Sequence, residues 1–178
     1  MQHCVLSRIA VPDDIDFLYQ AMTADDQYLY STKLKFGSIQ AFEQWLVCRL
    51  RSDFHDFYIV TDAKTKQKVG YVHNYDFSLR DGHCKLVVYI CPAFRKTGVG
   101  AVAAVHFVAR LFERYPLRKL YSTIYDYNRE SLKSNLAAGF AEEGVLRDYR
   151  YYDGTAHSIH YLSLSRDAFE TRMKKWVK

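Results

Sequence analysis

A glycine-containing loop between an apolar run and an amphipathic stretch is the feature that most constrains the fold of this chain. Residues 86–90 are apolar, and apolar side chains recur every three or four positions from Val102 to Phe112; between them lies Pro92-Ala93-Phe94-Arg95-Lys96-Thr97-Gly98-Val99-Gly100. This order predicts a strand, a tight loop and a long helix that ends near Tyr115-Pro116. Because residues 120–125 return to a strand pattern, the predicted unit is strand, helix, parallel strand.

The remaining segments predict antiparallel strands and further helices around this unit. Strands are expected at residues 5–9, 57–61, 68–75 and 83–90, and a hairpin at 145–152 and 156–164. Helices are expected after Pro12-Asp13-Asp14 and at residues 38–51, 131–138 and in the C-terminal tail, whereas residues 25–37 predict a loop. The predicted fold class is α/β, with a mixed, largely antiparallel central sheet that is flanked by helices.

Composition excludes several classes of protein. The 178 residues are 49% hydrophobic and 25% charged, which fits one globular domain over residues 1–178. No apolar run approaches the roughly 20 residues of a membrane helix, and Met1-Gln2-His3-Cys4-Val5 lacks the layout of a signal peptide, so we expect a cytoplasmic protein without a membrane partner. The cysteines at 4, 48, 84 and 91 lack metal-finger spacing, so we expect reduced thiols and no metal site.

The loop at residues 95–101 has the features of a phosphate-binding site. Gly98 and Gly100 let a ligand approach the backbone, and Arg95 and Lys96 add positive charge beside the first turn of the predicted helix. The net charge of +5 suits a small polyanion and is too mild to indicate a nucleic-acid partner. The alternative interpretation is that the two glycines belong to an ordinary strand-to-helix turn that binds no ligand.

A dinucleotide is a second possible phosphate ligand, because residues 98–103 match a loose GxGxxA pattern. The spacing argues against it. A dinucleotide fold places its first glycine at the end of the strand and an acid about 20 residues later. Here several residues precede Gly98, and positions 118 and 119 hold Arg and Lys.

The same residues carry a family resemblance. Arg95-Lys96-Thr97-Gly98-Val99-Gly100 resembles the [Arg/Gln]-x-x-Gly-x-[Gly/Ala] pyrophosphate loop of the GNAT superfamily of N-acetyltransferases. Asn128-Arg129-Glu130-Ser131, Gly139-Phe140, Glu143-Gly144 and Asp153-Gly154 are similar to the pattern of its branch that acetylates ribosomal-protein N-termini and polyamines such as spermidine. The two blocks span about residues 84 to 165 in the order of the family.

This resemblance implies acetyl-CoA as co-substrate and a primary amine of a small molecule or peptide as acceptor. It implies that the strands at 83–91 and 120–125 part at their carboxyl ends, where a backbone amide of the first strand can bond the thioester carbonyl. A monomer or a homodimer would suit this activity. The implied cofactor-binding residues are Ile90, Arg95, Lys96, Thr97, Gly98, Val99, Gly100, Ala101 and Asn128.

Three residues are candidates for proton transfer. Ser131 occupies the family position near the sulfur and could protonate the thiolate. Tyr89 shares a strand face with His83, Lys85 and Val87 and lies nearest the expected gap, and Asp126 ends the 120–125 strand; either could be the general base. A helix-start serine, a packed tyrosine and a solvated loop aspartate are the structural alternatives.

Two departures from the family pattern leave a second function open. Lys85 stands where relatives often carry glutamate, and Asn135 stands where many carry tyrosine. A catalytically silent acyl-CoA-binding or interaction module is therefore the alternative.

The acceptor side is less defined by the sequence. Asp25, Asp26, Tyr28 and Tyr30 fall in the loop that shapes the acceptor site in the family, and the two acids could receive a cationic amine. Protein N-termini, polyamines and amino sugars all remain open as acceptors. His157 and His160 are expected on opposite faces of a strand, as satisfied or surface imidazoles.

Overall fold

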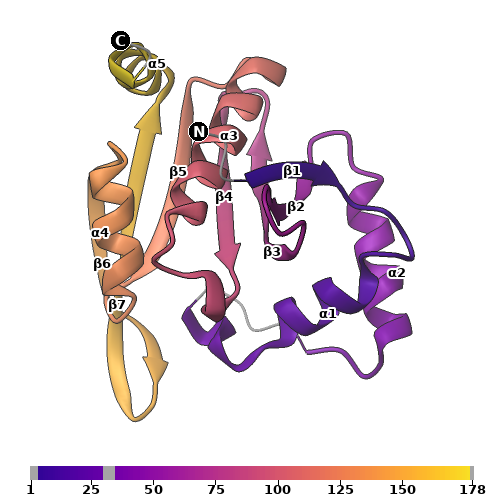
Figure 1. The fold of residues 1–178 in the computed structure, drawn as a ribbon. Helices are drawn as coiled ribbons and strands as arrows, with labels where there is room; N and C mark the ends of the chain where they lie inside the picture. Colours follow the sequence, from indigo (N-terminus) through magenta and orange to yellow (C-terminus); the bar gives the residue numbers. More distant parts are fainter. Residues whose placement is uncertain (1–3, 30–34, 177–178) are drawn as a thin grey trace.

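The computed structural model describes residues 4–29 and 35–176, which form a seven-stranded sheet with helices on both faces (Figure 1). The strand order is β1-β2-β3-β4-β5-β7-β6. The strands are β1 (Cys4–Arg8), β2 (Phe57–Asp62), β3 (Lys68–Ser78), β4 (His83–Ile90), β5 (Lys119–Tyr125), β6 (Ala141–Tyr152) and β7 (Thr155–Ser165). The helices are α1 (Ile15–Thr23), α2 (Ile39–Leu50), α3 (Val99–Arg114), α4 (Arg129–Ala137) and α5 (Arg166–Trp176), with short 3-10 helices η1 (Asp25–Leu29) and η2 (Pro92–Phe94).

The pairing of the strands confirms the predicted fold class. β4 and β5 are parallel, and the other neighbouring strands of the described sheet are antiparallel. α3 connects β4 to β5, so the strand, helix, strand unit expected from the sequence is present. Such a connection needs a crossover because parallel strands cannot be joined by a tight hairpin.

The sheet opens between β4 and β5. The two strands pair at His83 with Lys119, Cys84 with Leu120 and Lys85 with Tyr121, and the described pairing stops there. β4 continues beside β3 as far as Ile90, and β5 continues beside β7 as far as Tyr125. Each strand therefore keeps its outer neighbour while the carboxyl ends diverge, as Figure 1 shows.

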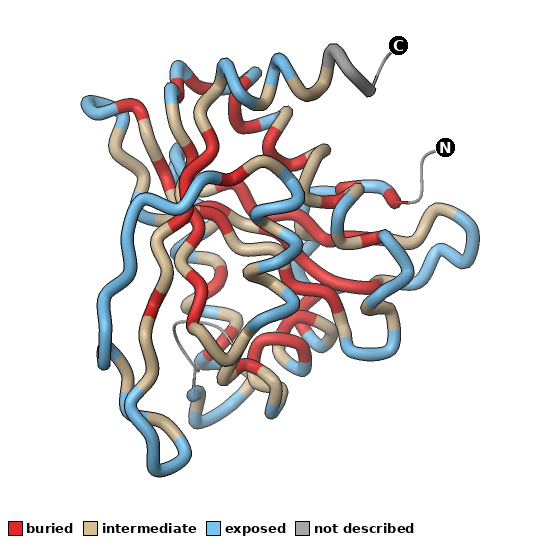
Figure 2. The backbone as a smooth tube through the Cα atoms, turned by 90° about the vertical axis from the view of Figure 1, so that its left-hand side faces the viewer, coloured by how far each residue is buried: buried red, intermediate tan, exposed pale blue. Residues whose placement is uncertain are grey.

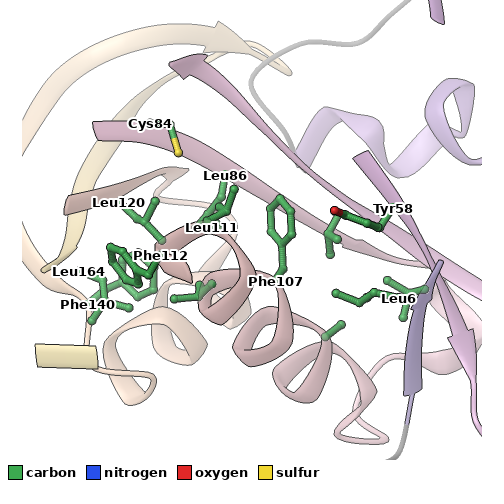
Figure 3. Packing of buried hydrophobic residues seen from close by; sticks show 14 of the residues in the cluster. Leu6, Tyr58, Cys84, Leu86, Phe107, Leu111, Phe112, Leu120, Phe140 and Leu164 are labelled. Carbon is green, nitrogen blue, oxygen red and sulfur yellow. The ribbon is translucent and has the colours of Figure 1, made fainter. Parts of the chain in front are cut away.

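The two faces of the sheet carry separate hydrophobic clusters. On one face α3 packs against β4 and β5, with Phe107 and Leu111 lying near Leu86 and Leu120 (Figure 3). On the other face α1 and α2 pack against β2, β3 and β4. Period-two alternation explains the division, because adjacent strand residues point to opposite faces of the sheet.

The outer edge of the sheet is open on the β6 side. β6 is exposed along most of its length (Figure 2), and α4 has no fully buried residue. No helix in the described part of the chain is long and apolar enough to cross a membrane.

Two short elements, η1 and η2, lie where the sequence predicted loops. Residues 25–29 form η1, where a loop was expected, because Gln27 is buried and its Nε2 donates a 2.6 Å hydrogen bond to the carbonyl of Ala21. A single turn of this kind has no periodicity for the sequence to reveal. Tyr30 lies outside the described residues.

Candidate active site

The loop between β4 and α3 is fixed by its own hydrogen bonds. Thr97 Oγ1 donates to the carbonyl of Phe94 at 2.7 Å and accepts from the amide of Val99 at 3.4 Å. Gly98 precedes the helix with φ of +87°, and Lys96 also has a positive φ, of +64°. Glycine adopts this left-handed conformation without steric cost, which explains Gly98 at the start of α3.

The start of α3 fits a pyrophosphate group. The first amides of a helix have no acceptor within the helix, and the helix dipole adds partial positive charge there. A Cβ built on Gly98 would meet nothing within 4 Å, so the surface above this backbone is open. A Cβ on Gly100 would lie 3.1 Å from the side chain of Ile90, so glycine here permits close packing of α3 on β4. Val99 is buried, whereas Lys96 is exposed beside the loop.

Arg95 is positioned differently from the other residues of the loop. Its Nε donates to the carbonyl of Ile90 at 2.9 Å, and its guanidinium is ion-paired with Asp26 of η1. From the sequence, we predicted that the positive charge of Arg95 faces the phosphate of the ligand. In the structure the guanidinium is also paired with Asp26, so Arg95 joins the loop before α3 to the segment after α1.

Tyr89 is buried on the face of β4 that α1 and α2 cover. Its hydroxyl donates to Asp26 at 3.2 Å, and its ring stacks on Tyr71 with centroids 4.9 Å apart. Burial, and next the negative charge of Asp26, raise the pKa of Tyr89 well above its ordinary value. A phenol held neutral in this way is a weak base, so the geometry favours a positioning role for Tyr89 over the role of general base.

Asp126 forms a pair with a histidine at the open end of β5. Asp126 Oδ1 lies 2.9 Å from His157 Nδ1, and Asp126 Oδ2 accepts from the amide of Ser158 at 2.9 Å. Partial burial raises the pKa of Asp126, but the hydrogen bonds from Ser158 and His157 outweigh it and bring that pKa below its ordinary value. An ionised carboxylate only accepts hydrogen bonds, so His157 Nδ1 carries the proton and Nε2 is the basic atom of the neutral ring.

Ser131 and Asn128 lie together at the start of α4. Asn128 Oδ1 accepts from the amide of Ser131 at 3.4 Å, and its Nδ2 donates to the carbonyl of Leu29 at 3.3 Å. Ser131 Oγ accepts from Asn135 Nδ2 at 3.4 Å. Asn128 is thus a helix cap that also contacts η1, and Asn135 occupies the side of Ser131 where the family pattern has tyrosine.

An aromatic cluster that the sequence analysis did not identify connects η1 to the end of β5 and to the edge strand β6. Tyr28 stacks on Tyr152 with centroids 5.3 Å apart, and the hydroxyl of Tyr127 donates to the carbonyl of Tyr28 at 2.8 Å. Arg150 Nη1 lies within 3.1 Å of that carbonyl, and its guanidinium lies over Tyr125 and Tyr152. The cluster joins residues more than 100 positions apart, so only the abundance of tyrosine hints at it in the sequence.

Two other polar groups that the sequence singled out are each paired with an acid. Lys85, at the position where relatives often carry glutamate, pairs with Asp76 at 2.9 Å. His160 Nδ1 lies 2.6 Å from Glu142, whereas His157 pairs with Asp126, so the two histidines bond different acids. Among the described residues, no group of three or more His, Cys, Asp and Glu side chains could hold a metal ion.

Comparison with known proteins identifies the family. A family model described as an acetyltransferase (GNAT) domain matches residues 5–141, which is more than half of the chain. The protein therefore belongs to the GNAT family of acetyltransferases and is an acyltransferase with acetyl-CoA as its co-substrate. The resemblance carried by the glycine loop and by the block after Asn128 is confirmed.

Individual relatives agree with this assignment. An uncharacterized N-acetyltransferase, YokL, derived from the SPbeta prophage of Bacillus subtilis, is 22% identical over 165 residues, covering 92% of this chain and 90% of the relative. A spermidine N-acetyltransferase from Vibrio cholerae, solved in complex with CoA and spermine, superposes with a TM-score of 0.87 at 16% identity, covering 96% of this chain and 99% of that one. A probable GNAT acetyltransferase from Chromobacterium violaceum superposes with a TM-score of 0.77 at 19% identity, covering 96% of this chain and 86% of that one. At these identities the structural likeness establishes a shared fold.

Proposed function

We propose that the protein transfers an acetyl group from acetyl-CoA directly to the nitrogen of a primary amine. The observation that carries the proposal is the gap between β4 and β5 next to the glycine loop at the start of α3. A pantetheine arm in that gap could use the backbone of β4 near Ile90, while the loop at residues 95–101 receives the pyrophosphate. We also propose that it acts in the cytoplasm, as a monomer or homodimer.

The chain offers a base for the acceptor amine. A primary ammonium has a pKa near 10 and must lose a proton before its nitrogen can attack. We assign the base role to His157 Nε2, held in the required tautomer by Asp126. Asp126, which the sequence suggested as the base, then acts through His157. A base of this kind typically contributes about 10² to 10⁴-fold.

Ser131 remains the proposed donor of a proton to the departing thiolate. Its hydroxyl accepts from Asn135, so its own hydrogen is directed elsewhere. Tyr89 is proposed to position Asp26 beside Arg95, and Asn128 to orient the pantetheine from the cap of α4. A backbone amide of β4 would donate to the thioester carbonyl.

Protein N-termini, polyamines and amino sugars are the acceptor classes left open by the sequence. The Vibrio cholerae neighbour is a spermidine acetyltransferase, so spermidine belongs in the first panel. The alternative, a silent acyl-CoA-binding module, is favoured by Lys85 and Asn135 at family catalytic positions.

Release of free thiol from acetyl-CoA over a panel of amines separates the two functions. Transfer predicts amine-dependent thiol release, with no more than slow hydrolysis when amine is omitted. Tight CoA binding without turnover on any amine would contradict the proposed transfer and support the silent module.

A further inference from the structure

A cavity of about 450 Å³ lies between α2 and the β2, β3 and β4 part of the sheet. We call it the α2 cavity. Its walls are mostly aromatic rings from separate elements, and the lining includes Trp45, Phe54, Phe57, Tyr71, His73 and Val87. The cavity is open to solvent on one side, and its size and aromatic walls are those of a small-molecule site, so it is a candidate ligand site.

Two histidines in the cavity wall have unused hydrogen-bonding capacity. Both ring nitrogens of His55 are buried, and the polar contact that the ring makes is a weak one to the backbone of Arg49. His73 Nδ1 lies 3.2 Å from the carbonyl of Asn74, so this nitrogen is the donor and Nε2 is left as an acceptor. Buried polar atoms without partners are rare in proteins and cost free energy. A hydroxyl on a ligand could donate to the unprotonated nitrogen of such a ring and could also accept from its N–H group.

The same histidines are uncharged near neutral pH. Burial, and next the charge of Arg49, lower the pKa of His55. Burial, and next His55, lower the pKa of His73 to about 3. The cavity therefore presents neutral imidazoles, which can accept a hydrogen bond from a hydroxyl or N–H group.

The α2 cavity lies on the same face of the sheet as Tyr89. Its lining residue Tyr71 stacks on Tyr89, and its lining residue Gln27 is next to Asp26, to which Tyr89 donates. Val87, also in the lining, lies two residues before Tyr89 on the same face of β4, past the last described pair with β5. A ligand in the cavity would thus lie on the same face of the sheet as Tyr89, which follows the last described pair of β4 with β5.

The charges around the cavity argue against a polycation. Among its described lining residues Asp76 is the one acid, and its carboxylate is ion-paired with Lys85 Nζ at 2.9 Å. Arg49 also lines the cavity and places its guanidinium over Trp45. The further ammonium group of a polyamine would lose its hydration in the cavity without gaining a free carboxylate as partner. An aromatic ring would instead be stabilised by stacking and by burial.

We propose that the α2 cavity is an acceptor subsite that takes the aromatic ring of an arylalkylamine bearing a ring hydroxyl, with the primary amine directed to the gap between β4 and β5. His55 accepts the hydrogen bond of the ring hydroxyl, with His73 beside it. The inference rests on the proposed acetyl transfer and names its substrate class. Transfer forms an N–C bond to the acetyl carbon, breaks the C–S bond of acetyl-CoA, and moves the amine proton to the departing thiolate by way of protein groups.

The first test is calorimetric titration of the protein with tyramine, 2-phenylethylamine, n-butylamine and spermidine. We expect tyramine to bind at least 10-fold more tightly than n-butylamine and spermidine, and several-fold more tightly than 2-phenylethylamine. Equal affinities for tyramine and n-butylamine, or tighter binding of spermidine, would overturn the assignment.

A matched variant isolates the role of His55. His55→Phe keeps a ring in the wall but removes both buried, poorly satisfied ring nitrogens, so it should raise the melting temperature. It should also bring tyramine to the affinity of 2-phenylethylamine, whereas His55→Gln should restore part of the preference. Unchanged preference for tyramine in His55→Phe would contradict the hydrogen bond. If His55→Phe fails to fold, the ligand series on the parent protein still decides the proposal.

Turnover distinguishes failure of this inference from failure of the proposed function. With acetyl-CoA present, kcat/KM for tyramine should exceed that for n-butylamine by at least 10-fold. Acetylation of spermidine with no binding or turnover of tyramine would overturn the cavity assignment and leave the transferase intact. Tyramine binding without turnover of any amine would instead overturn acetyl transfer, and with it the acceptor role of the cavity.

Discussion

Asp126 Oδ1 lies 2.9 Å from His157 Nδ1, so the carboxylate that follows β5 and an imidazole of β7 form one hydrogen-bonded pair. The amide of Ser158 holds the second oxygen of the same carboxylate. If the pair acts as a unit, Asp126→Asn should lower kcat/KM by about 10-fold or more, and His157→Gln by about 100-fold. The double variant should be no slower than His157→Gln alone, because groups that act together are not additive.

The control for this double-mutant cycle is His160→Gln. His160 lies on the same strand as His157, but its partner is Glu142. This variant should leave kcat/KM within about twofold of the parent value. Additive losses in the Asp126 and His157 cycle, measured by steady-state kinetics, would show that the two residues do not share one role.

The glycine loop should decide the affinity for CoA. In Gly98→Val a β-branched residue would have to adopt the left-handed φ of +87°, which is strained. Its methyl groups would also occupy the open surface above the start of α3. We expect CoA binding, measured by calorimetry, to weaken at least 10-fold. Gly144→Val is the matched control, because a Cβ there also meets nothing within 4 Å but the residue lies in the edge strand β6. A folded Gly98→Val protein with parental CoA affinity would refute the loop assignment.

Ser131 should affect turnover more than cofactor affinity. Ser131→Ala removes the hydroxyl but keeps the backbone amide that Asn128 caps, so α4 should remain folded. We expect kcat to fall by about 10 to 100-fold with little change in KM for acetyl-CoA, the pattern of a contact made mainly in the transition state. Ser134→Ala, one turn along on the exposed side of α4, should leave kcat unchanged. An unchanged kcat in Ser131→Ala, under conditions where chemistry limits the rate, would return Ser131 to a structural role.

His73 should make stability depend on pH. Its pKa is lowered to about 3 in the folded state by burial and by His55, whereas an unfolded histidine titrates near 6.5. Between these values the unfolded chain binds one more proton at this site, so stability falls as pH falls, by at most about 1.4 kcal/mol per pH unit. Urea unfolding of His73→Phe should show a flatter dependence than the parent between pH 6.5 and 4. Parallel curves for the two proteins would contradict the lowered pKa.

The sequence predicted most of the fold because the fold is dominated by local patterns. The alternation in 83–90, the helical spacing after Gly98 and the turn at Asp153-Gly154 each lie within about 20 residues of chain, and all were found in the structure. The loop before α3 could be proposed as a cofactor site for the same reason. Its glycines and its helix are contiguous in sequence.

The remaining site could not be read from sequence because its contacts join distant segments. Arg95 meets Asp26 across 69 positions, and His157 meets Asp126 across 31. Strand alternation separated His157 from His160 but could not show that one of them faces Asp126. The α2 cavity is lined by residues from several helices and strands and from the segment between α2 and β2. A space between separate elements leaves no periodic signal in any one of them.

The central claim is that the acetyl group passes directly from acetyl-CoA to an amine. It is tested most directly by mass spectrometry of a reaction that contains acetyl-CoA labelled with ¹³C in the acetyl group, the amine that gives the fastest thiol release, and the parent protein. The account predicts one labelled acetyl group on the amine nitrogen for each thiol released, with no label retained on the protein. Free labelled acetate in place of acetylated amine, or a labelled protein side chain that forms and decays during turnover, would contradict direct transfer.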